Sequence, residues 1–299
     1  MAIRKSNLQN WNLRWRKKKI IPKFSFQKFL HQDQTIQRIY VYKSIQIYLF
    51  CFNSQQQIDD KGLSDLAIKI ASNKSHLKVL KLDLSQNIIG DQGLAELSEI
   101  GNCSILTELN LNLSQQNSQK QITDEGLLIL YGFLTKLKNI QTLDIDLSTN
   151  KIAGENRGIL SLLSDLPNLK KLTINLNNNQ FGYRGMFGLS KILLYCRDLR
   201  YLNIQIRNNG FETIALEQFV MVFKYLTQIE HIIMDIQDNK VVNDIWIIMF
   251  ELGIKSCNQL RSFVFYLQNN NIHLGNTYKK SNKYFHKMKL LVKADFKLI

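Results

Sequence analysis

An eleven-residue motif, L-x-x-L-x-L-x-L-x-x-N, recurs eight times in this 299-residue chain and constrains its fold more than any other feature. Seven copies are clear, and the first copy is weaker. The copies begin at residues 45, 77, 106, 140, 169, 199, 229 and 260, so neighbouring copies start 29 to 34 residues apart. Self-similarity at such a period is typical of a solenoid, in which each repeat packs only against its neighbours.

Each motif carries the pattern of a strand with one buried face. Apolar residues at the fourth, sixth and eighth positions alternate with other residues, and this period of two predicts a strand. The eleventh position is Asn in six copies and Gln in two, at Gln55 and Gln116. The chain must turn there, and a carboxamide can both donate to and accept from the backbone of a neighbouring coil. The motif therefore predicts a buried ladder of carboxamides.

A helix is predicted after each of the first seven motifs. The segments IDDKGL, IGDQGL and ITDEGL, at residues 58–63, 89–94 and 122–127, lead into apolar residues at helical spacing. A small residue is predicted to precede the helix and to permit a tight turn. It recurs at Gly62, Gly93, Gly126, Gly158, Gly185 and Ala215. Each repeat thus reads as strand, turn and helix, with parallel strands on the concave face and helices on the convex face.

These motifs resemble the leucine-rich-repeat superfamily, and most closely its longer, ribonuclease-inhibitor-like subtype, over residues 45–270. The resemblance implies an α/β horseshoe of about eight repeats. It also implies a non-enzymatic scaffold that binds another protein. Two alternatives stay open: a fragment or regulatory arm of a larger signalling protein, such as a kinase or ubiquitin-ligase subunit, and a binder of nucleic acid or anionic membrane that acts through basic tails.

The net charge of +15 belongs to the two ends of the chain. Residues 1–44 hold eleven Lys or Arg and one acid, and residues 271–299 hold seven Lys and one acid, whereas residues 45–270 have a net charge of −1. The sequence predicts three parts: an irregular basic flank over 1–44, the repeat array over 45–270, and a basic cap or tail over 271–299. No ninth motif is predicted, because a start at Leu290 puts Lys293 at a buried position.

The N-terminal flank has several interpretations. Its most basic residues are Arg14, Arg16, Lys17, Lys18 and Lys19. A plain basic tail is one interpretation; a mitochondrial presequence, contact with anionic membrane or nucleic acid, and a nuclear-import cluster are the others. No stretch reaches the roughly 18 apolar residues of a membrane span. An intracellular, cytoplasmic protein is predicted, with mitochondria and the nucleus as alternatives.

The cysteines and glycines are interpreted as structural. Cys103, Cys196 and Cys257 stand three residues before a motif, where other copies carry Leu, so a place in the core and a reducing compartment are expected. Phosphate-loop, zinc-protease and kinase motifs are absent from the sequence. We therefore predict no enzymatic activity, no cofactor and no metal ligands.

Candidate binding residues are the outward positions of the strands. The seventh position gives Cys51 in the first copy and the fifth gives Leu49, and the later copies place polar residues in the same two rows. An acidic centre favours a partner with a basic surface, while a solvated sheet face and a hard cation held by Asp144, Asp146, Asn112 and Asn175 are the alternatives. The predicted partner-binding residues are Asp83, Asn112, Asp144, Asp146, Asn175, Asn203, Gln205, Asp235 and Tyr266.

Overall fold

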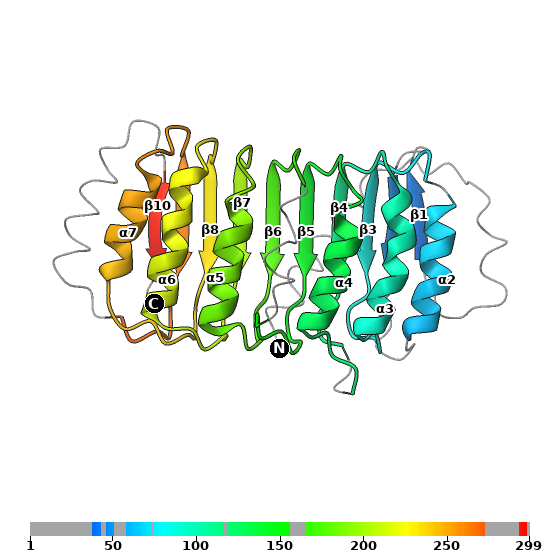
Figure 1. Cartoon of the computed structure of the whole chain (residues 1–299), viewed down its shortest axis with the longest axis horizontal. Coiled ribbons are helices and arrows are strands. Elements are labelled where there is room, and N and C mark those ends of the chain that lie inside the picture. The colour runs from blue at the N-terminus through cyan, green and yellow to red at the C-terminus, as the bar shows by residue number, and fades with distance from the viewer. Residues whose placement is uncertain are drawn as a thin grey trace, which may run out of the picture.

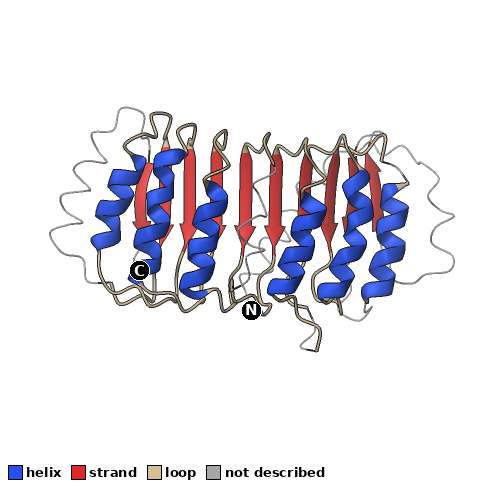
Figure 2. Cartoon of the chain, in the orientation of Figure 1, coloured by secondary structure: helices blue, strands red, loops and turns tan. Residues whose placement is uncertain are grey.

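The computed structural model describes residues 38–42, 46–50, 58–72, 74–116, 119–155, 166–272 and 293–297. Within them, ten strands form one sheet in chain order, and the helices lie in one layer on one face of that sheet (Figures 1 and 2). The strands are β1 (Arg38–Tyr42), β2 (Gln46–Phe50), β3 (Val79–Asp83), β4 (Glu108–Asn112), β5 (Thr142–Asp146), β6 (Lys171–Asn175), β7 (Tyr201–Gln205), β8 (His231–Asp235), β9 (Ser262–Tyr266) and β10 (Lys293–Lys297).

The fold is a leucine-rich-repeat solenoid, as predicted. Strands β3 to β9 each begin at the third residue of a clear motif, and they pair in parallel from neighbour to neighbour. The helix predicted after the fourth motif falls on residues 156–165, which lie outside the described residues. The helices are α2 (Asp60–Ala71), α3 (Asp91–Glu96), η2 (Leu97–Asn102), α4 (Asp124–Leu134), α5 (Gly182–Leu193), α6 (Thr213–Val220), η4 (Met221–Tyr225) and α7 (Ile245–Ile254).

The repeat gives the solenoid two rims. Segments that lead from a strand end to a helix start form the lower rim in Figure 1, and segments that lead from a helix end to a strand start form the upper rim. Between the rims, the fourth, sixth and eighth motif positions fill one continuous apolar core, as Leu143, Ile145 and Leu147 do in the fourth motif. Burial of this apolar surface is the main driving force for folding.

The carboxamide ladder is confirmed on the lower rim. Asn150 Oδ1 accepts from the backbone N–H of Ile122 at 3.1 Å. Its Nδ2 donates to the carbonyls of Leu113 and Leu147 at 3.1 and 3.0 Å. Each member of the ladder bonds to the backbone of the preceding coil in this way, so each side chain ties two repeats together. The members are Asn87, Gln116, Asn150, Asn179, Asn209, Asn239 and Asn270.

The glycines predicted to precede α2, α3, α4 and α5 instead lie inside the first turns of these helices, and Gly158 lies outside the described residues. Two of them, Gly93 and Gly126, leave space for an acid of the preceding repeat. A Cβ on Gly126 of α4 would lie 2.3 Å from Asp91 Oδ1 of the preceding repeat. Asp91 uses its two carboxylate oxygens to accept from the N–H and the hydroxyl of Thr123, at 2.8 and 2.6 Å. A carboxylate near a helix N-terminus is favourable. The glycine therefore makes room for a second link between coils.

The first motif is shifted by one residue from the prediction. In the sheet Tyr48 pairs with Lys81 and Phe50 with Asp83, so the motif starts at Ser44 and not at residue 45. Tyr48 and Phe50 hold the fifth and seventh positions, which had been assigned to Leu49 and Cys51. Both alternations are apolar in this segment, so the sequence pattern did not determine which set faces the core.

The prediction that the array has no ninth parallel motif is wrong. Strand β10 pairs in parallel with β9, and Lys293 lies opposite Ser262. The motif therefore starts at Leu291, which puts Ala294 and Phe296 at the fourth and sixth positions. At the other end, β1 pairs with β2 in antiparallel orientation, so the described part of the sheet extends into the segment predicted to be an irregular flank.

Candidate functional site

The helix-free face of the sheet is the candidate binding surface. Helices are about 10 Å across and strands lie about 4.8 Å apart, so the sheet curves toward this face, which we call the concave face. The third, fifth and seventh motif positions line it. In β3, β4, β5, β7 and β8 these positions are half-buried and the residues between them are buried. All nine predicted binding residues lie on this face.

The acidic centre lies on β5 and is held by amides from the neighbouring strands. Asn110 Nδ2 donates to Asp144 Oδ2 at 2.8 Å, and Asn175 Nδ2 donates to Asp146 Oδ2 at 2.9 Å. Burial raises the pKa of Asp144, the Lys171 charge opposes that rise, and the Asp146 charge adds to it. Asp144 therefore carries its negative charge at a cost that a cation from a partner would offset.

The seventh-position residues also have a structural role. Oδ1 of Asp146 accepts from the backbone N–H of Ser148 at 2.9 Å, which closes a local turn as the chain leaves the strand. The same bond is made by Asp83, Asn112, Asn175 and Asp235. The preference for Asp or Asn here thus follows partly from the fold. The second oxygen or nitrogen of each side chain remains for contacts across the face.

A third row of the concave face was missed by sequence reasoning. It comes from the third motif position, where the motif has no consensus residue, although alternation places it outward with the fifth and seventh. Here Lys171 Nζ lies 4.9 Å from the Tyr201 ring centroid, and the Tyr201 and His231 rings are 6.3 Å apart. His231 Nδ1 and Ser262 Oγ are hydrogen-bonded at 2.7 Å.

The C-terminal end of the concave face is more apolar than its centre. Ile233, Val264 and Tyr266 lie there beside Asp235, whose pKa is raised mainly by burial, with a backbone hydrogen bond from Gln237 opposing the shift. Next to Ile233 on β7, the Asn203 Oδ1 atom is buried and accepts no hydrogen bond within the described residues. An unsatisfied acceptor of this kind is costly, and a ligand donor would relieve the cost.

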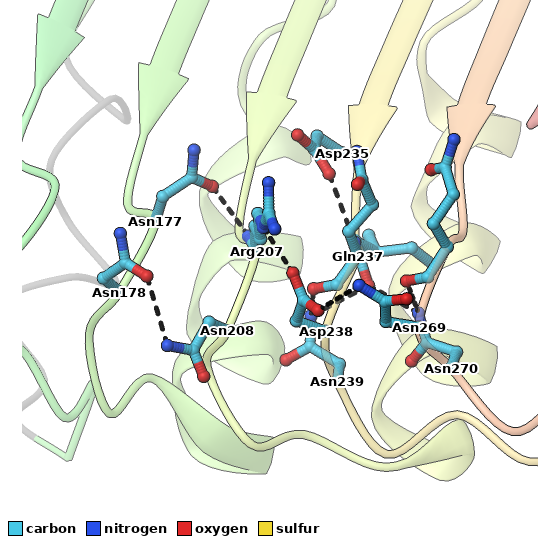
Figure 3. Close-up of polar contacts among 12 residues, drawn as sticks. Asn177, Asn178, Arg207, Asn208, Asp235, Gln237, Asp238, Asn239, Asn269 and Asn270 are labelled. Atoms are coloured by element: carbon cyan, nitrogen blue, oxygen red, sulfur yellow. Dashed lines mark hydrogen bonds and ion pairs between the residues drawn. The ribbon is translucent and has the colours of Figure 1, made fainter. Parts of the chain in front are cut away.

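The lower rim below this surface is a connected polar network (Figure 3). The tenth residue of each clear motif has φ between 53° and 61°, a left-handed conformation that Asn and Asp tolerate best. Asn208 Nδ2 donates to Asn178 Oδ1 at 3.1 Å, and Asn269 Nδ2 donates to Asp238 Oδ1 at 2.6 Å. Asp238 also forms an ion pair with Arg207. These contacts join the four coils that follow β6, β7, β8 and β9.

Of the remaining predicted residues, three cysteines lie in the described part of the chain and the others do not. Cys103, Cys196 and Cys257 are buried free thiols, and burial raises their pKa values to about 11, 12 and 12, so their core role is confirmed. Cys51 and the basic flank residues Arg14, Arg16, Lys17, Lys18 and Lys19 lie outside the described residues.

In the described part of the chain, no helix has the length and apolarity needed to cross a membrane. No group of three or more His, Cys, Asp or Glu there is placed to hold a metal ion.

Comparisons with known proteins find distant likenesses in structure. No family model and no curated protein matches the chain. One similar solved structure is internalin C2 of Listeria monocytogenes, with 21% identity, 83% of this chain and 80% of that chain covered, and a TM-score of 0.44. Another is the Rad7 and Elc1 complex of yeast, with 17% identity, 80% and 66% covered, and a TM-score of 0.34. The fold assignment stands on the repeat geometry of this chain.

Proposed function

We propose that this protein is a non-enzymatic scaffold that holds a basic and partly apolar segment of another protein on its concave face. The observation that carries the proposal is the acidic centre on β5, where partial burial raises the pKa of Asp144 and so disfavours its negative charge. A Lys or Arg of the partner would stabilise that charge. Ile233, Val264 and Tyr266 would then supply apolar contact beside it, as aromatic anchors do in binding hot spots.

The surface is organised before a partner arrives. The Asn110–Asp144 and Asn175–Asp146 hydrogen bonds fix these side chains between strands that are themselves rigid. A site whose side chains are already ordered loses less conformational entropy on binding.

The proposal also includes the ribonuclease-inhibitor-like subtype, because repeats of 29 to 34 residues carry convex helices of 11 or 12 residues in α2, α4 and α5.

Charge neutralisation that preserves the fold tests this function. Asn makes the local turn at the seventh motif position of β4 and β6, so Asp83→Asn and Asp235→Asn should retain it. The triple variant adds Asp144→Asn at the fifth position, where β4 carries Asn110. The triple variant should capture several-fold less of the partner in affinity purification from the native lysate. Cross-links between the unchanged protein and the captured partner should map to residues of the sheet. A matched control neutralises Asp65, Glu99 and Glu125, which are exposed away from this face. Equal loss in both variants would contradict concave-face binding.

The basic N-terminal flank is proposed to compete with the same partner. Its charge is opposite to that of the acidic centre, so it would screen or cover the concave face. Deletion of residues 1–36 leaves β1 intact and should strengthen capture of a basic partner at low salt, with the effect fading as salt screens the charges. If the truncated protein captures less partner, the flank is itself a binding element.

A further inference from the structure

Exposed cations are concentrated on the upper rim. The described segments of this rim hold nine Lys or Arg, all exposed, and only two acids, Asp198 and Glu230. The described segments of the lower rim hold four basic and five acidic residues. The near-zero net charge of the array therefore conceals a strip of positive charge along one edge.

The strip is ordered by the sheet. At the second motif position, the backbone N–H of each repeat donates to the carbonyl of the same position in the repeat before it, without interruption from Lys78 to Arg261. Lys170 and Arg200 are neighbours in this row, joined at 2.8 Å through their backbones. With neighbouring strands about 4.8 Å apart, the row extends over about 29 Å. Thr107, Gln141 and Glu230 are the other residues of the row, and Glu230 contacts Arg200 and Arg261 at 3.5 and 3.7 Å.

Helix dipoles explain only some of these cations. Lysines near a helix C-terminus, such as Lys255 after α7, stabilise the partial negative charge there. Lys78, Lys170, Arg200 and Arg261 instead stand at the starts of strands. Within the described residues, Lys78 and Lys170 make no ion pair, so local electrostatics do not account for their presence.

Two tyrosines at equivalent positions stand among the cations. Tyr195 and Tyr225 each lie four residues before a motif, on adjacent repeats, and are 61% and 47% exposed. Lys224 Nζ lies 4.8 Å from the centroid of the Tyr225 ring, and Arg197 follows Tyr195 by two residues. Large exposed aromatic rings among cations have no role in the packing of the core. They are well suited to stacking against planar groups.

We propose that the upper rim is a binding surface for single-stranded nucleic acid. The strand-start cations would contact the phosphates, and Tyr195 and Tyr225 would stack on successive bases. A cationic track combined with aromatic platforms is the arrangement by which proteins hold single strands without sequence preference. The acidic centre of the neighbouring sheet face repels phosphates, which confines the strand to the rim. A duplex has no unpaired bases for the tyrosines, and an acidic peptide would need only the cations.

Fluorescence anisotropy with a labelled 20-nucleotide oligo(dT), using the full chain at two salt concentrations, tests the proposal. Binding should weaken steeply with salt, because cation–phosphate contacts release counterions. Lys170→Glu with Arg197→Glu should weaken binding at least tenfold. Tyr195→Ala with Tyr225→Ala should weaken binding of oligo(dT) about fivefold or more, as loss of stacking does, and leave duplex binding unchanged.

Two control proteins separate the rim from other sources of affinity. Lys151→Glu with Lys240→Glu makes the same charge change at exposed positions of the lower rim and should have little effect. Replacement of Arg14, Arg16, Lys17, Lys18 and Lys19 by Ala measures the basic flank. The proposal fails if the lower-rim control loses as much affinity as the upper-rim variant, or if only the flank variant loses it. Equal binding of polyglutamate and oligo(dT), with no effect of the tyrosine changes, would assign the rim to an acidic protein instead.

Discussion

The two rims of the solenoid differ in how they use polar and charged side chains. On the lower rim, carboxamides, left-handed turn residues and helix-start carboxylates bond one coil to the next, so most polar groups there have a structural partner. On the upper rim, the backbone row provides that connection, and long cationic side chains and two tyrosines extend into solvent. A repeat protein thus has one rim where substitutions should damage the fold and one where they should affect only binding.

The largest expected effect is on the carboxamide ladder. Asn150→Ala leaves the Ile122 N–H and the Leu113 carbonyl without their buried partner, which should cost about 3 kcal/mol of unfolding free energy. Asn270→Ala makes the same change next to the last described strands, where the side chain is less buried, and should cost less. Calorimetry on both variants measures the difference; a neutral Asn150→Ala would refute the ladder.

The second largest effect is expected from packing at the start of helix α4. Gly126→Ala brings a Cβ to 2.3 Å from Asp91 Oδ1 and 2.9 Å from Ile122 Cγ2, and overpacking of this kind costs about 1–3 kcal/mol. Gly132→Ala in the same helix meets nothing within 4 Å and should stabilise by about 0.5–1 kcal/mol. Urea unfolding should therefore give opposite signs for the two changes. The same sign in both would exclude the carboxylate contact as the cause.

A substitution that stabilises the lower rim is expected at Thr149. This β-branched residue has φ of 59°, a conformation that costs roughly 1–2 kcal/mol for most side chains. Asn occupies the equivalent position in three other repeats, so Thr149→Asn should raise the free energy of unfolding by up to about 1 kcal/mol. A lower melting temperature for this variant would show that the Thr149 side chain has a role of its own.

On the concave face, Asp144→Asn should change the free energy of unfolding by an amount that depends on pH. The folded-state pKa of Asp144 is raised, so the native state holds its proton more tightly than the unfolded state and the charged form destabilises the fold at neutral pH. Asp144→Asn should therefore stabilise at pH 7, and the gain should vanish as pH falls through the raised pKa toward the ordinary Asp value. Thermal melts from pH 3 to 7 measure this difference; a gain that grows on acidification would contradict it.

The smallest change in stability is expected on the upper rim. Lys170→Glu with Arg197→Glu alters two exposed side chains and should change unfolding free energy by less than about 0.5 kcal/mol per site. The difference in unfolding free energy between this double variant and Asn150→Ala measures how differently the two rims contribute to stability. An upper-rim double variant that unfolds as easily as Asn150→Ala would show that both rims stabilise the fold.

Most clear motifs predicted their strands well because one alternation is apolar and the other polar, as in Leu143-Asp144-Ile145-Asp146. The first motif lacks that contrast, and its register followed from pairing with β3. The ninth motif was within reach of the sequence: a start at Leu291 keeps the alternation and puts Lys293 at an outward position. For the candidate site, the rows were predicted, but the local turns made by Asp83, Asp146 and Asp235 were not, because the Asp or Asn that recurs at the seventh position was interpreted only as an outward binding residue.

The sequence by itself determined the solenoid, the parallel strands of the clear repeats, the buried cysteines and the carboxamide ladder. These depend on residues within one repeat and on a period that brings each repeat beside its copy. Only the tertiary structure decided how charge is distributed. Upper-rim segments alternate along the chain with helices and strands that carry an excess of acids, such as Asp124 and Glu125 of α4 and Asp144 and Asp146 of β5, so the net charge of the array is close to zero. The coil gathers the upper-rim segments on one edge, and that spatial sorting creates the cationic strip that the linear sequence hides.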